Sequence, residues 1–407
     1  MGAIGGVKFP EGVERAKVLH VITRLILGGA QQNTMITASR LDAERFDVTL
    51  VSGPQTGSEG ELIGEVTRRG IRLRILGNLV REISPWKDLA ALVALYRLMR
   101  SQAFSVVHTH SSKAGILGRV AAKLAGVPVI VHTVHGWGFH DRMRAPQRWL
   151  FVQLERWTAA MSDALIVVSS VLKETGLREG IGSPDQYVTI YSGIELAEFD
   201  RPGLDGAVKR AELGIPAGVP VVGTVGRLSS QKNPEDLLIA ARRVIQRMPD
   251  VRFLIVGDGP LRGRVEELTR AMGISGNVLL TGIRHDVPEL MASLDVFVLS
   301  SLWEGLPRVI PQAMAAGKPV VCTNVDGNAE AVRHGVNGLL VHPKDPDALA
   351  DAILQLLGNP GLARQMGVEG RRRVAIFSAD KMLEDIEVLY ERLLAKEPGR
   401  AVARSAK

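Results

Sequence analysis

The chain contains 407 residues, of which 46% are apolar and 23% are charged, with a single cysteine. Compact domains usually stop growing at about 250 residues, so the length predicts two domains, and the apolar content excludes disorder over most of the chain. One cysteine excludes a disulfide framework, and no apolar run approaches the ~18 residues of a membrane-spanning helix. We therefore expect a cytoplasmic protein whose net charge of +7 allows at most a mild affinity for phosphate groups or an anionic membrane.

The first half of the chain alternates short apolar runs with amphipathic stretches. The apolar runs cover residues 17–23, 46–53, 71–76, 105–110, 128–134 and 164–170. Helical patterns lie between them, for example over residues 85–102 and 113–126. Apolar runs separated by helices are typical of a parallel sheet that is covered on both faces, so the pattern predicts an α/β domain.

The same alternation restarts in the second half, with apolar runs at residues 219–226, 251–259, 277–282, 295–301, 318–323 and 338–341. A region rich in Gly, Pro and charge near residue 200 separates the halves. We expect an N-terminal domain over residues 1–200, a second domain over 201–375, and over 376–407 a helix that packs back toward the first domain, followed by a disordered tail. Each domain is predicted to be a Rossmann-like, doubly wound parallel sheet, in which ligands bind beyond the carboxyl ends of the strands.

Two loops carry residues that suit a diphosphate. Gly28 and Gly29 lie between the first predicted strand and its helix, where glycines let a backbone approach a phosphate closely. A tight turn without a ligand explains the same pair equally well. Arg227 and Lys232 flank a polar loop before a predicted helix, and two cations beside a helix N-terminus can hold a diphosphate. On composition alone, solvated surface charges are the commoner explanation.

The segment SSLWEGLPRVIPQAMAAGKPVV is the most specific string in the chain. It predicts a strand end followed by Glu304, a turn and a helix. Glu304 would lie at the mouth of a binding site, with the amides of Gly305 and Leu306 exposed to an anion or a sugar oxygen. Gln312 would lie about two helical turns further on, where its amide could meet a hydroxyl group.

Together these strings resemble the retaining family-4 glycosyltransferases of the GT-B fold. The resemblance covers residues 17–395 and rests on LGGAQ, HTHSSKAGILGR, VHGWGF, VGRLSSQKNP, IVGDGP, TGIRHDVPELMASLDVFVLSSLWEGLP and AMAAGKPVV. It implies a GT-B fold, in which two Rossmann-like domains face each other across a cleft. It also implies transfer of a sugar from a nucleotide-diphosphate sugar to an acceptor hydroxyl, with retention of the anomeric configuration.

The resemblance further implies roles for individual residues. Arg227 and Lys232 would hold the diphosphate, Glu304 would contact the transferred sugar, and His135 would lie beside the reacting carbon; these four form the expected catalytic set. The expected donor-binding set is Gly28, Gly29, Arg227, Lys232, Gly257, Gly282, Ile283, Arg284, Glu304, Gly305, Leu306, Pro307 and Gln312, in which the turn Gly282–Arg284 receives the base. The acceptor side would be lined by His110, Ser111, Ser112 and Trp137.

One departure from the family pattern concerns the ribose. The family carries a second Glu that holds both ribose hydroxyls, and this chain has Gln312 there, preceded by Pro311. A carboxylate accepts from both hydroxyls, whereas an amide offers one acceptor and one donor group. We therefore expect nucleotide binding to be weaker by about 1–3 kcal/mol. Pro311 lacks an amide hydrogen, which predicts that it lies within the first turn of its helix.

Metal sites and cofactors are not expected. His108 and His110 share one face of a predicted strand, but no carboxylate or cysteine at ligand spacing joins them. Asp345-Pro346-Asp347 has the form of an Asp-x-Asp metal motif, yet the helical pattern after it predicts a helix cap. The nucleotide sugar itself would be the substrate, and no metal would be required.

Residues 137–157 mix aromatic side chains with four arginines. The aromatic residues are Trp137, Phe139, Trp149, Phe151 and Trp157. Basic residues beside aromatic ones can lay a helix on an anionic membrane surface. A helix packed on its own sheet, with its arginines in water, explains the composition as well, and both interpretations stay open.

The function that we expect is sugar transfer in polysaccharide or glycolipid synthesis. The donor would be a UDP- or GDP-linked sugar, and the acceptor a sugar or a lipid-linked saccharide at the inner face of the cell membrane. The evenly spread charge predicts no nucleic-acid partner. Two alternatives remain open: a nucleotide-sugar epimerase or hydrolase of the same fold, and a non-catalytic sugar-binding subunit.

Overall fold

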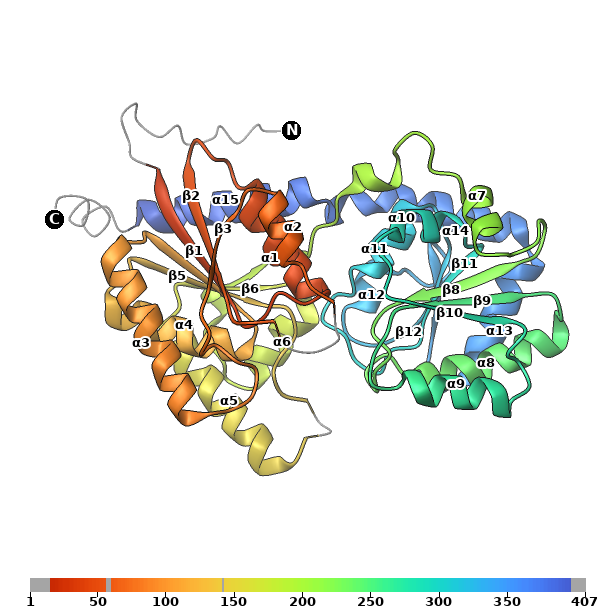
Figure 1. Ribbon diagram of the computed structural model, residues 1–407, viewed down its shortest axis with the longest axis horizontal. Helices are drawn as coiled ribbons and strands as arrows, with labels where there is room; N and C mark the ends of the chain where they lie inside the picture. Colours follow the sequence, from red (N-terminus) through yellow and green to blue (C-terminus); the bar gives the residue numbers. More distant parts are fainter. Residues whose placement is uncertain (1–14, 56–59, 141–142, 397–407) are drawn as a thin grey trace. The chain divides into compact units, whose positions relative to one another are not determined.

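The computed structural model describes residues 15–55, 60–140 and 143–396, which form two compact α/β units (Figure 1). The first unit contains the chain up to Val168, Leu172–Ile190 and the chain from Met382 onward. The second contains Ser169–Val171 and Tyr191–Lys381. The main change of unit, at residues 190–191, therefore lies before the boundary near residue 200 that the sequence predicts. The tail that we expect to be disordered lies outside the described residues.

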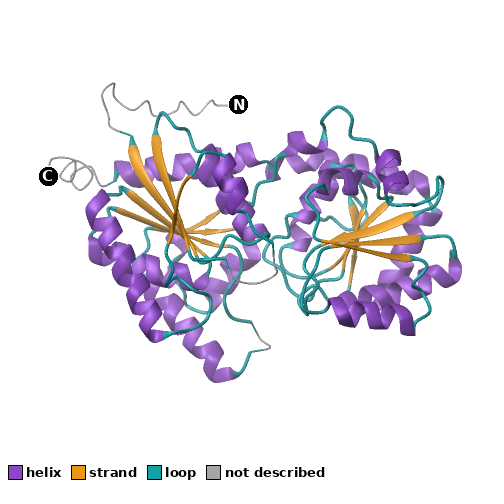
Figure 2. Cartoon of the chain, viewed as in Figure 1, coloured by secondary structure: helices purple, strands orange, loops and turns teal. Residues whose placement is uncertain are grey.

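The first unit is built on a seven-stranded parallel sheet in the order β3-β2-β1-β4-β5-β6-β7. Figure 2 shows the strands of each unit in orange with purple helices around them. Its strands are β1 Ala16–Ile22, β2 Phe46–Ser52, β3 Arg72–Ile75, β4 Val106–His110, β5 Val129–Val134, β6 Ala164–Val167 and β7 Tyr187–Thr189. β1 to β6 correspond to the six predicted apolar runs. β7 was not predicted, because a strand of three residues gives too short an apolar run.

Helices cover both faces of this sheet. They are α1 Gly29–Arg40, α2 Ile63–Arg68, α3 Pro85–Gln102, α4 Ser112–Ala125, α5 Ala145–Ala159, α6 Ser170–Arg178 and α15 Ala379–Ala395, with a 3₁₀ turn at Pro184–Gln186. α4 packs between α3 and α5 on one face (Figure 1). α15 lies on the other face, where the Tyr390 hydroxyl is 2.5 Å from Nδ1 of His108 and Glu387 and Glu391 pair with Arg45.

The second unit is built on a six-stranded parallel sheet in the order β10-β9-β8-β11-β12-β13. Its strands are β8 Val221–Val225, β9 Arg252–Val256, β10 Val278–Gly282, β11 Val296–Leu299, β12 Val320–Thr323 and β13 Gly338–Val341. Its helices are α7 Gly206–Glu212, α8 Pro234–Arg247, α9 Arg262–Ala271, α10 Val287–Ala292, α11 Val309–Ala315, α12 Asn328–Ala331, α13 Pro346–Gly358 and α14 Pro360–Arg373, with 3₁₀ turns at Leu196–Phe199 and Val374–Phe377. In this unit too, the strands match the predicted apolar runs.

Two local features follow the sequence directly. The Asp345 carboxylate accepts a hydrogen bond of 2.9 Å from the amide of Ala348 at the start of α13, which confirms the predicted helix cap. Cys322 in β12 is fully buried, and burial raises the pKa of its thiol. The side chain therefore packs as a small apolar group, as its setting in the sequence predicts.

Candidate functional site

In the second unit, three glycines bring the carboxyl ends of β8, β9 and β10 close together. Gly257 has φ +131°, and a Cβ on it would lie 2.0 Å from the carbonyl oxygen of Gly226. Its amide donates a 2.8 Å hydrogen bond to the carbonyl oxygen of Gly282, which itself has φ +71°. Only glycine fits this conformation and spacing at position 257, so the missing side chain lets the loops after β8 and β9 approach each other closely.

Lys232 and Glu304 form an ion pair at the same edge of the sheet. Lys232 lies in the loop before α8, and Glu304 follows the end of β11. The Glu304 side chain is only 6% exposed and that of Lys232 is 21% exposed. The structure thus joins two residues 72 positions apart that the resemblance assigns to the donor site.

Neighbouring groups fix the orientation of Glu304. Oε1 also accepts a 2.6 Å hydrogen bond from the Ser301 hydroxyl, and Gln231 Nε2 lies 3.5 Å from Oε2. The amide of Glu304 donates a 2.7 Å hydrogen bond to the Asp326 carboxylate. A carboxylate held at both its backbone and its side chain loses little further entropy when it binds a ligand. Sequence reasoning missed Ser301, Gln231 and Asp326, because nothing in the spacing links them to Glu304.

The two predicted arginines of this unit differ in their surroundings. Arg227 is exposed, in the loop after β8. Arg284 donates hydrogen bonds of 2.8 and 2.6 Å to the two carboxylate oxygens of Asp286, which also accepts one from Lys209. The hydrogen bonds from Arg284 are the main cause that lowers the pKa of Asp286. The Arg284 guanidinium is therefore held within the turn by Asp286.

The segment after Glu304 differs from the expectation in one respect. α11 begins only at Val309, so Gln312 is the fourth residue of that helix and does not lie two helical turns beyond Glu304. Leu306 and Pro307 are buried, whereas Gly305 and Gln312 are half-buried. Pro311 is the third residue of α11, which confirms its predicted place in the first helical turn.

In the first unit, the predicted residues lie at the carboxyl ends of β1, β4 and β5. Gly28 precedes α1 in an extended conformation and Gly29 is the first residue of that helix. Ser111 has φ +61°, and its hydroxyl lies 2.8 Å from that of Thr23. Ser112 begins α4, and a Cβ on Gly138 would lie 2.4 Å from the Ser112 hydroxyl. This close packing joins the loop after β4 to the loop after β5.

His110 is placed differently from the expectation. Its residue is only 1% exposed, and its two ring nitrogens lie 3.0 Å from Nδ1 of His20 and 3.2 Å from Nε2 of His135. A ring buried in this way does not line the acceptor side directly. His110 instead contacts the half-buried His135 through its Nδ1 atom. Its side chain lies on the same face of the sheet as those of His20 and His108.

Trp137 also has partners within the protein. Its indole N–H donates a 3.0 Å hydrogen bond to the carbonyl oxygen of Leu172, and its ring stacks on Phe139 at 5.5 Å between centroids. The N–H is therefore already satisfied. The ring of Trp137 is half-buried.

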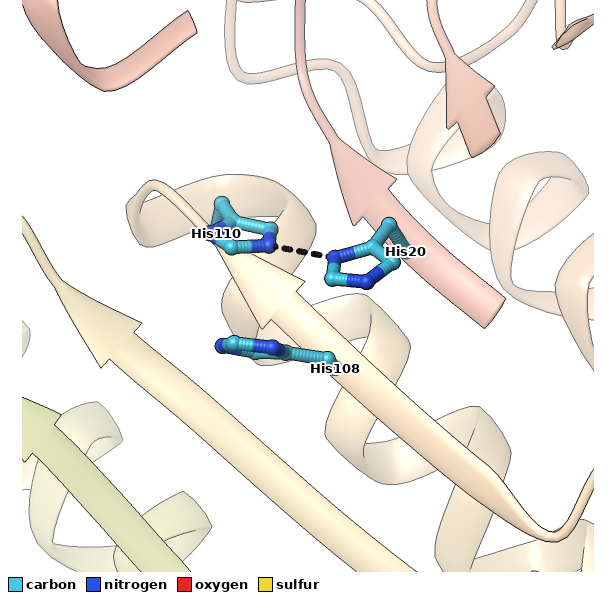
Figure 3. Close-up of side chains that lie close together, drawn as sticks. All are labelled: His20, His108 and His110. Atoms are coloured by element: carbon cyan, nitrogen blue, oxygen red, sulfur yellow. Dashed lines mark hydrogen bonds between the residues drawn. The ribbon is translucent and has the colours of Figure 1, made fainter. Parts of the chain in front are cut away.

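His20, His108 and His110 gather on one face of the sheet (Figure 3). One ligand nitrogen from each of them lies within 4.8 Å of the others. Sequence reasoning missed His20, which the β1–β4 register sets beside His108. Five of the six ring nitrogens already have hydrogen-bond partners, since His108 also bonds the hydroxyls of Tyr390 and Thr133. Only Nε2 of His20 is buried without one, so a metal ion would have to displace several hydrogen bonds.

Burial keeps these histidines neutral. It lowers the pKa of His20 to about 3, and it is also the main cause that lowers the pKa of His108, His110 and His132 well below the ordinary value. Neutral imidazoles donate from one nitrogen and accept at the other, which suits the observed chain from His20 through His110 to His135.

Comparison with known proteins gives the family. The model described as "Glycosyl transferases group 1" matches residues 206–373, and the "Glycosyl transferase 4-like domain" matches residues 28–193. The chain is 34% identical over 383 residues to the UDP-Gal:alpha-D-GlcNAc-diphosphoundecaprenol alpha-1,3-galactosyltransferase of Escherichia coli, covering 92% of this chain and 97% of that protein. The chain belongs to the group 1 glycosyltransferases.

This glycosyltransferase is also 32% identical to the alpha-maltose-1-phosphate synthase of Mycolicibacterium smegmatis, over 72% of this chain and 81% of that protein. Among solved structures it resembles Anabaena Alr3699/HepE in complex with UDP and glucose, with a TM-score of 0.80 and 22% identity over 93% of this chain and 100% of that chain. Sucrose-phosphate synthase from Thermosynechococcus elongatus gives a TM-score of 0.79 at 24% identity, over 94% and 100% of the two chains. These likenesses confirm the GT-B fold predicted from the sequence.

The described part of this glycosyltransferase contains no helix that is both long enough and apolar enough to cross a bilayer.

Proposed function

We propose that this glycosyltransferase transfers a hexose from a UDP- or GDP-linked donor to an acceptor hydroxyl with retention of the anomeric configuration. The observation that carries the proposal is the fixed Lys232–Glu304 pair at the glycine-lined edge of the second sheet. Cations and backbone amides at such an edge suit a diphosphate. The related E. coli enzyme is named for a UDP-linked sugar, and HepE was solved with UDP and glucose, which favours UDP.

In this proposal the second unit binds the donor. As the sugar leaves, negative charge develops on the diphosphate, and Arg227 and Lys232 stabilise it together with backbone amides. The two cations can neutralise this negative charge without a metal ion, so we infer that the reaction needs neither a metal nor another cofactor. Glu304 holds the sugar hydroxyls, and Gln312 meets the ribose.

The first unit supplies the acceptor side, with His135 positioning the sugar and Ser111 and Ser112 meeting the acceptor. The acceptor oxygen bonds to the anomeric carbon on the face that the diphosphate leaves, and a phosphate oxygen of the departing diphosphate takes the acceptor proton. No side chain acts as a nucleophile in this scheme.

We infer that the acceptor is a lipid-linked saccharide in polysaccharide or glycolipid synthesis, because the E. coli relative is named for a diphosphoundecaprenol-linked acceptor. Such an acceptor would require the enzyme to work in the cytoplasm, at the inner face of the cell membrane.

The test is to incubate the purified chain with a panel of nucleotide sugars and a cell lipid extract, with and without EDTA. We expect one donor to release its nucleoside diphosphate, and we expect mass spectrometry to detect a heavier lipid product. If the donor is an α-linked sugar, NMR should show an α-linkage in the product. EDTA should have no effect on the rate. Release without any acceptor product would indicate a hydrolase, a changed sugar without transfer would indicate an epimerase, and binding without turnover a non-catalytic subunit. Each of these results would contradict the proposal.

A further inference from the structure

The outer surface of α3 in the first unit is unusually apolar for a helix face exposed to water. Trp86, Leu89, Val93 and Tyr96 are all exposed, and Trp86 is 83% exposed. Their spacing of three, four and three residues places them along one side of the helix. Contiguous apolar surface of this kind marks an interaction site.

The surface extends over the other helices of the same layer. α4 packs between α3 and α5, and the three helices cover one face of the first sheet (Figure 1). Leu124 on α4 and Trp149, Leu150 and Trp157 on α5 are exposed as well. We call the exposed side of these helices the α3–α5 surface. The surface contains three tryptophans, Trp86, Trp149 and Trp157. A tryptophan ring has an apolar body and a polar N–H group, so it favours the boundary between lipid and water.

All exposed charges on these three helices are positive. They are Lys87, Arg97, Arg100, Lys123 and Arg156. The helices contain two acidic residues: Asp88 pairs with Lys113, and the buried Glu155 pairs with Arg119 at 2.7 Å. The nearest exposed acid before α3 is Glu82, which follows the exposed Arg81. Apolar and aromatic side chains among cations of one sign are the composition of a surface that binds anionic lipid.

We propose that the α3–α5 surface binds the anionic headgroup layer of a lipid bilayer. A second copy of the chain fits this surface poorly, because a two-fold contact would bring the same cations together. The proposal narrows the membrane interpretation of residues 137–157: Trp149 and Trp157 belong to the surface, whereas Phe139 is buried and Arg148 pairs with Glu179. The proposal depends on the surface alone, and it holds whichever sugar is transferred.

The test is flotation of the full chain with vesicles of phosphatidylcholine alone and of phosphatidylcholine with phosphatidylglycerol. We expect strong binding to the anionic vesicles only. Trp86→Ser with Leu89→Ser should lower that binding at least tenfold, because both side chains would enter the interface. Arg97→Gln with Arg100→Gln should lower it about 30-fold and weaken its salt dependence.

Matched controls come from exposed positions of the second unit. Val368→Ser removes an exposed apolar side chain, and Arg242→Gln with Arg247→Gln removes two exposed cations of α8; neither variant should change binding. Nucleoside diphosphate release with a water-soluble acceptor analogue should be the same in all variants. If the unaltered chain releases no nucleoside diphosphate, the proposed function is contradicted, whereas the membrane proposal still stands.

Three results would overturn the membrane proposal. The first is equal recovery of the unaltered chain with neutral and anionic vesicles. The second is an equal loss of binding in the control variants. The third is a dimer in analytical ultracentrifugation that the Trp86→Ser/Leu89→Ser variant converts to a monomer, which would assign the surface to a contact between copies.

Discussion

Lys232 Nζ and Glu304 Oε1 form an ion pair in the second unit, and the Ser301 hydroxyl bonds the same oxygen at 2.6 Å. The pair connects a cation expected to meet phosphate with a carboxylate expected to meet sugar. Each residue therefore fixes the orientation of the other, and such preorganisation lowers the entropic cost of binding a ligand.

Lys232→Ala and Arg227→Ala should each lower turnover about 100-fold or more, as the removal of charge stabilisers commonly does. The measurement is nucleoside diphosphate release at saturating donor. Arg247→Ala, on the exposed side of α8, is the matched control and should leave the rate unchanged. Near-normal rates in both variants would contradict the proposal that Lys232 and Arg227 stabilise the leaving diphosphate. The melting temperature of the Lys232→Ala variant should be measured as well, because this substitution leaves the buried Glu304 carboxylate without its cation.

Gln312→Glu should tighten nucleotide binding, because a carboxylate can accept from both ribose hydroxyls. The expected gain is about 5- to 150-fold in the Kd of the nucleoside diphosphate, measured by calorimetry. Gln246→Glu, at an exposed position of α8, adds the same charge elsewhere and should leave the Kd unchanged. An unchanged or weaker Kd in the Gln312 variant would show that the side chain does not meet the ribose.

His110 should act through His135, since Nδ1 of His110 lies 3.2 Å from Nε2 of His135. We expect His110→Phe and His135→Ala each to lower kcat about 10- to 100-fold, because a misplaced positioning group costs orientation. The double variant should be no slower than the slower single variant, because residues that act as a unit are not additive. Fully additive losses in this double-mutant cycle would contradict the link.

Acid should destabilise the first unit through its buried histidines. The pKa of His20 is lowered to about 3 in the folded chain, below its unfolded value of about 6.5. Between these values the unfolded state binds the extra proton, so the contribution to stability is present above pH 6.5 and is lost as the pH falls. One such group removes about 2 kcal/mol between pH 7 and pH 5.

Urea unfolding at pH 5, 6 and 7 measures this effect. His20→Leu should reduce the dependence of the unfolding free energy on pH by about one proton, or about 1.4 kcal/mol per pH unit below pH 6. His342→Gln removes an exposed histidine and should leave the pH dependence unaltered. If His20→Leu keeps the full slope, His20 is not the group that titrates on unfolding.

Gly257→Ala should destabilise the second unit by about 3 kcal/mol or more, because alanine strains the φ of +131° and its Cβ overlaps the Gly226 carbonyl. Gly263→Ala is the matched control. It lies in α9, a Cβ there meets nothing within 4 Å, and it should stabilise the chain by about 0.5 kcal/mol. Equal unfolding free energies for the two variants would contradict the proposed close approach.

Much of the fold was predictable because parallel strands buried on both faces give continuous apolar runs. β1 to β6 and β8 to β13 follow those runs, whereas the short β7 left no such pattern. The Asp345 cap and the position of Pro311 follow from local chemistry alone. The contacts change from one unit to the other at residues 190–191, ten residues before the Gly- and Pro-rich region that suggests a boundary near residue 200, because a compositional shift does not mark the residue at which contacts change.

The sequence by itself determined the residue types of the site and their order along loops, since Gly28, Arg227, Lys232 and Glu304 stand in strings that only this family combines. The tertiary structure decided which of them meet. It pairs Lys232 with Glu304, ties Arg284 to Asp286, and removes His110 from the surface by setting it between His20 and His135. The physical reason is that strand register and helix packing place side chains from distant segments together, and no local pattern encodes those long-range neighbours.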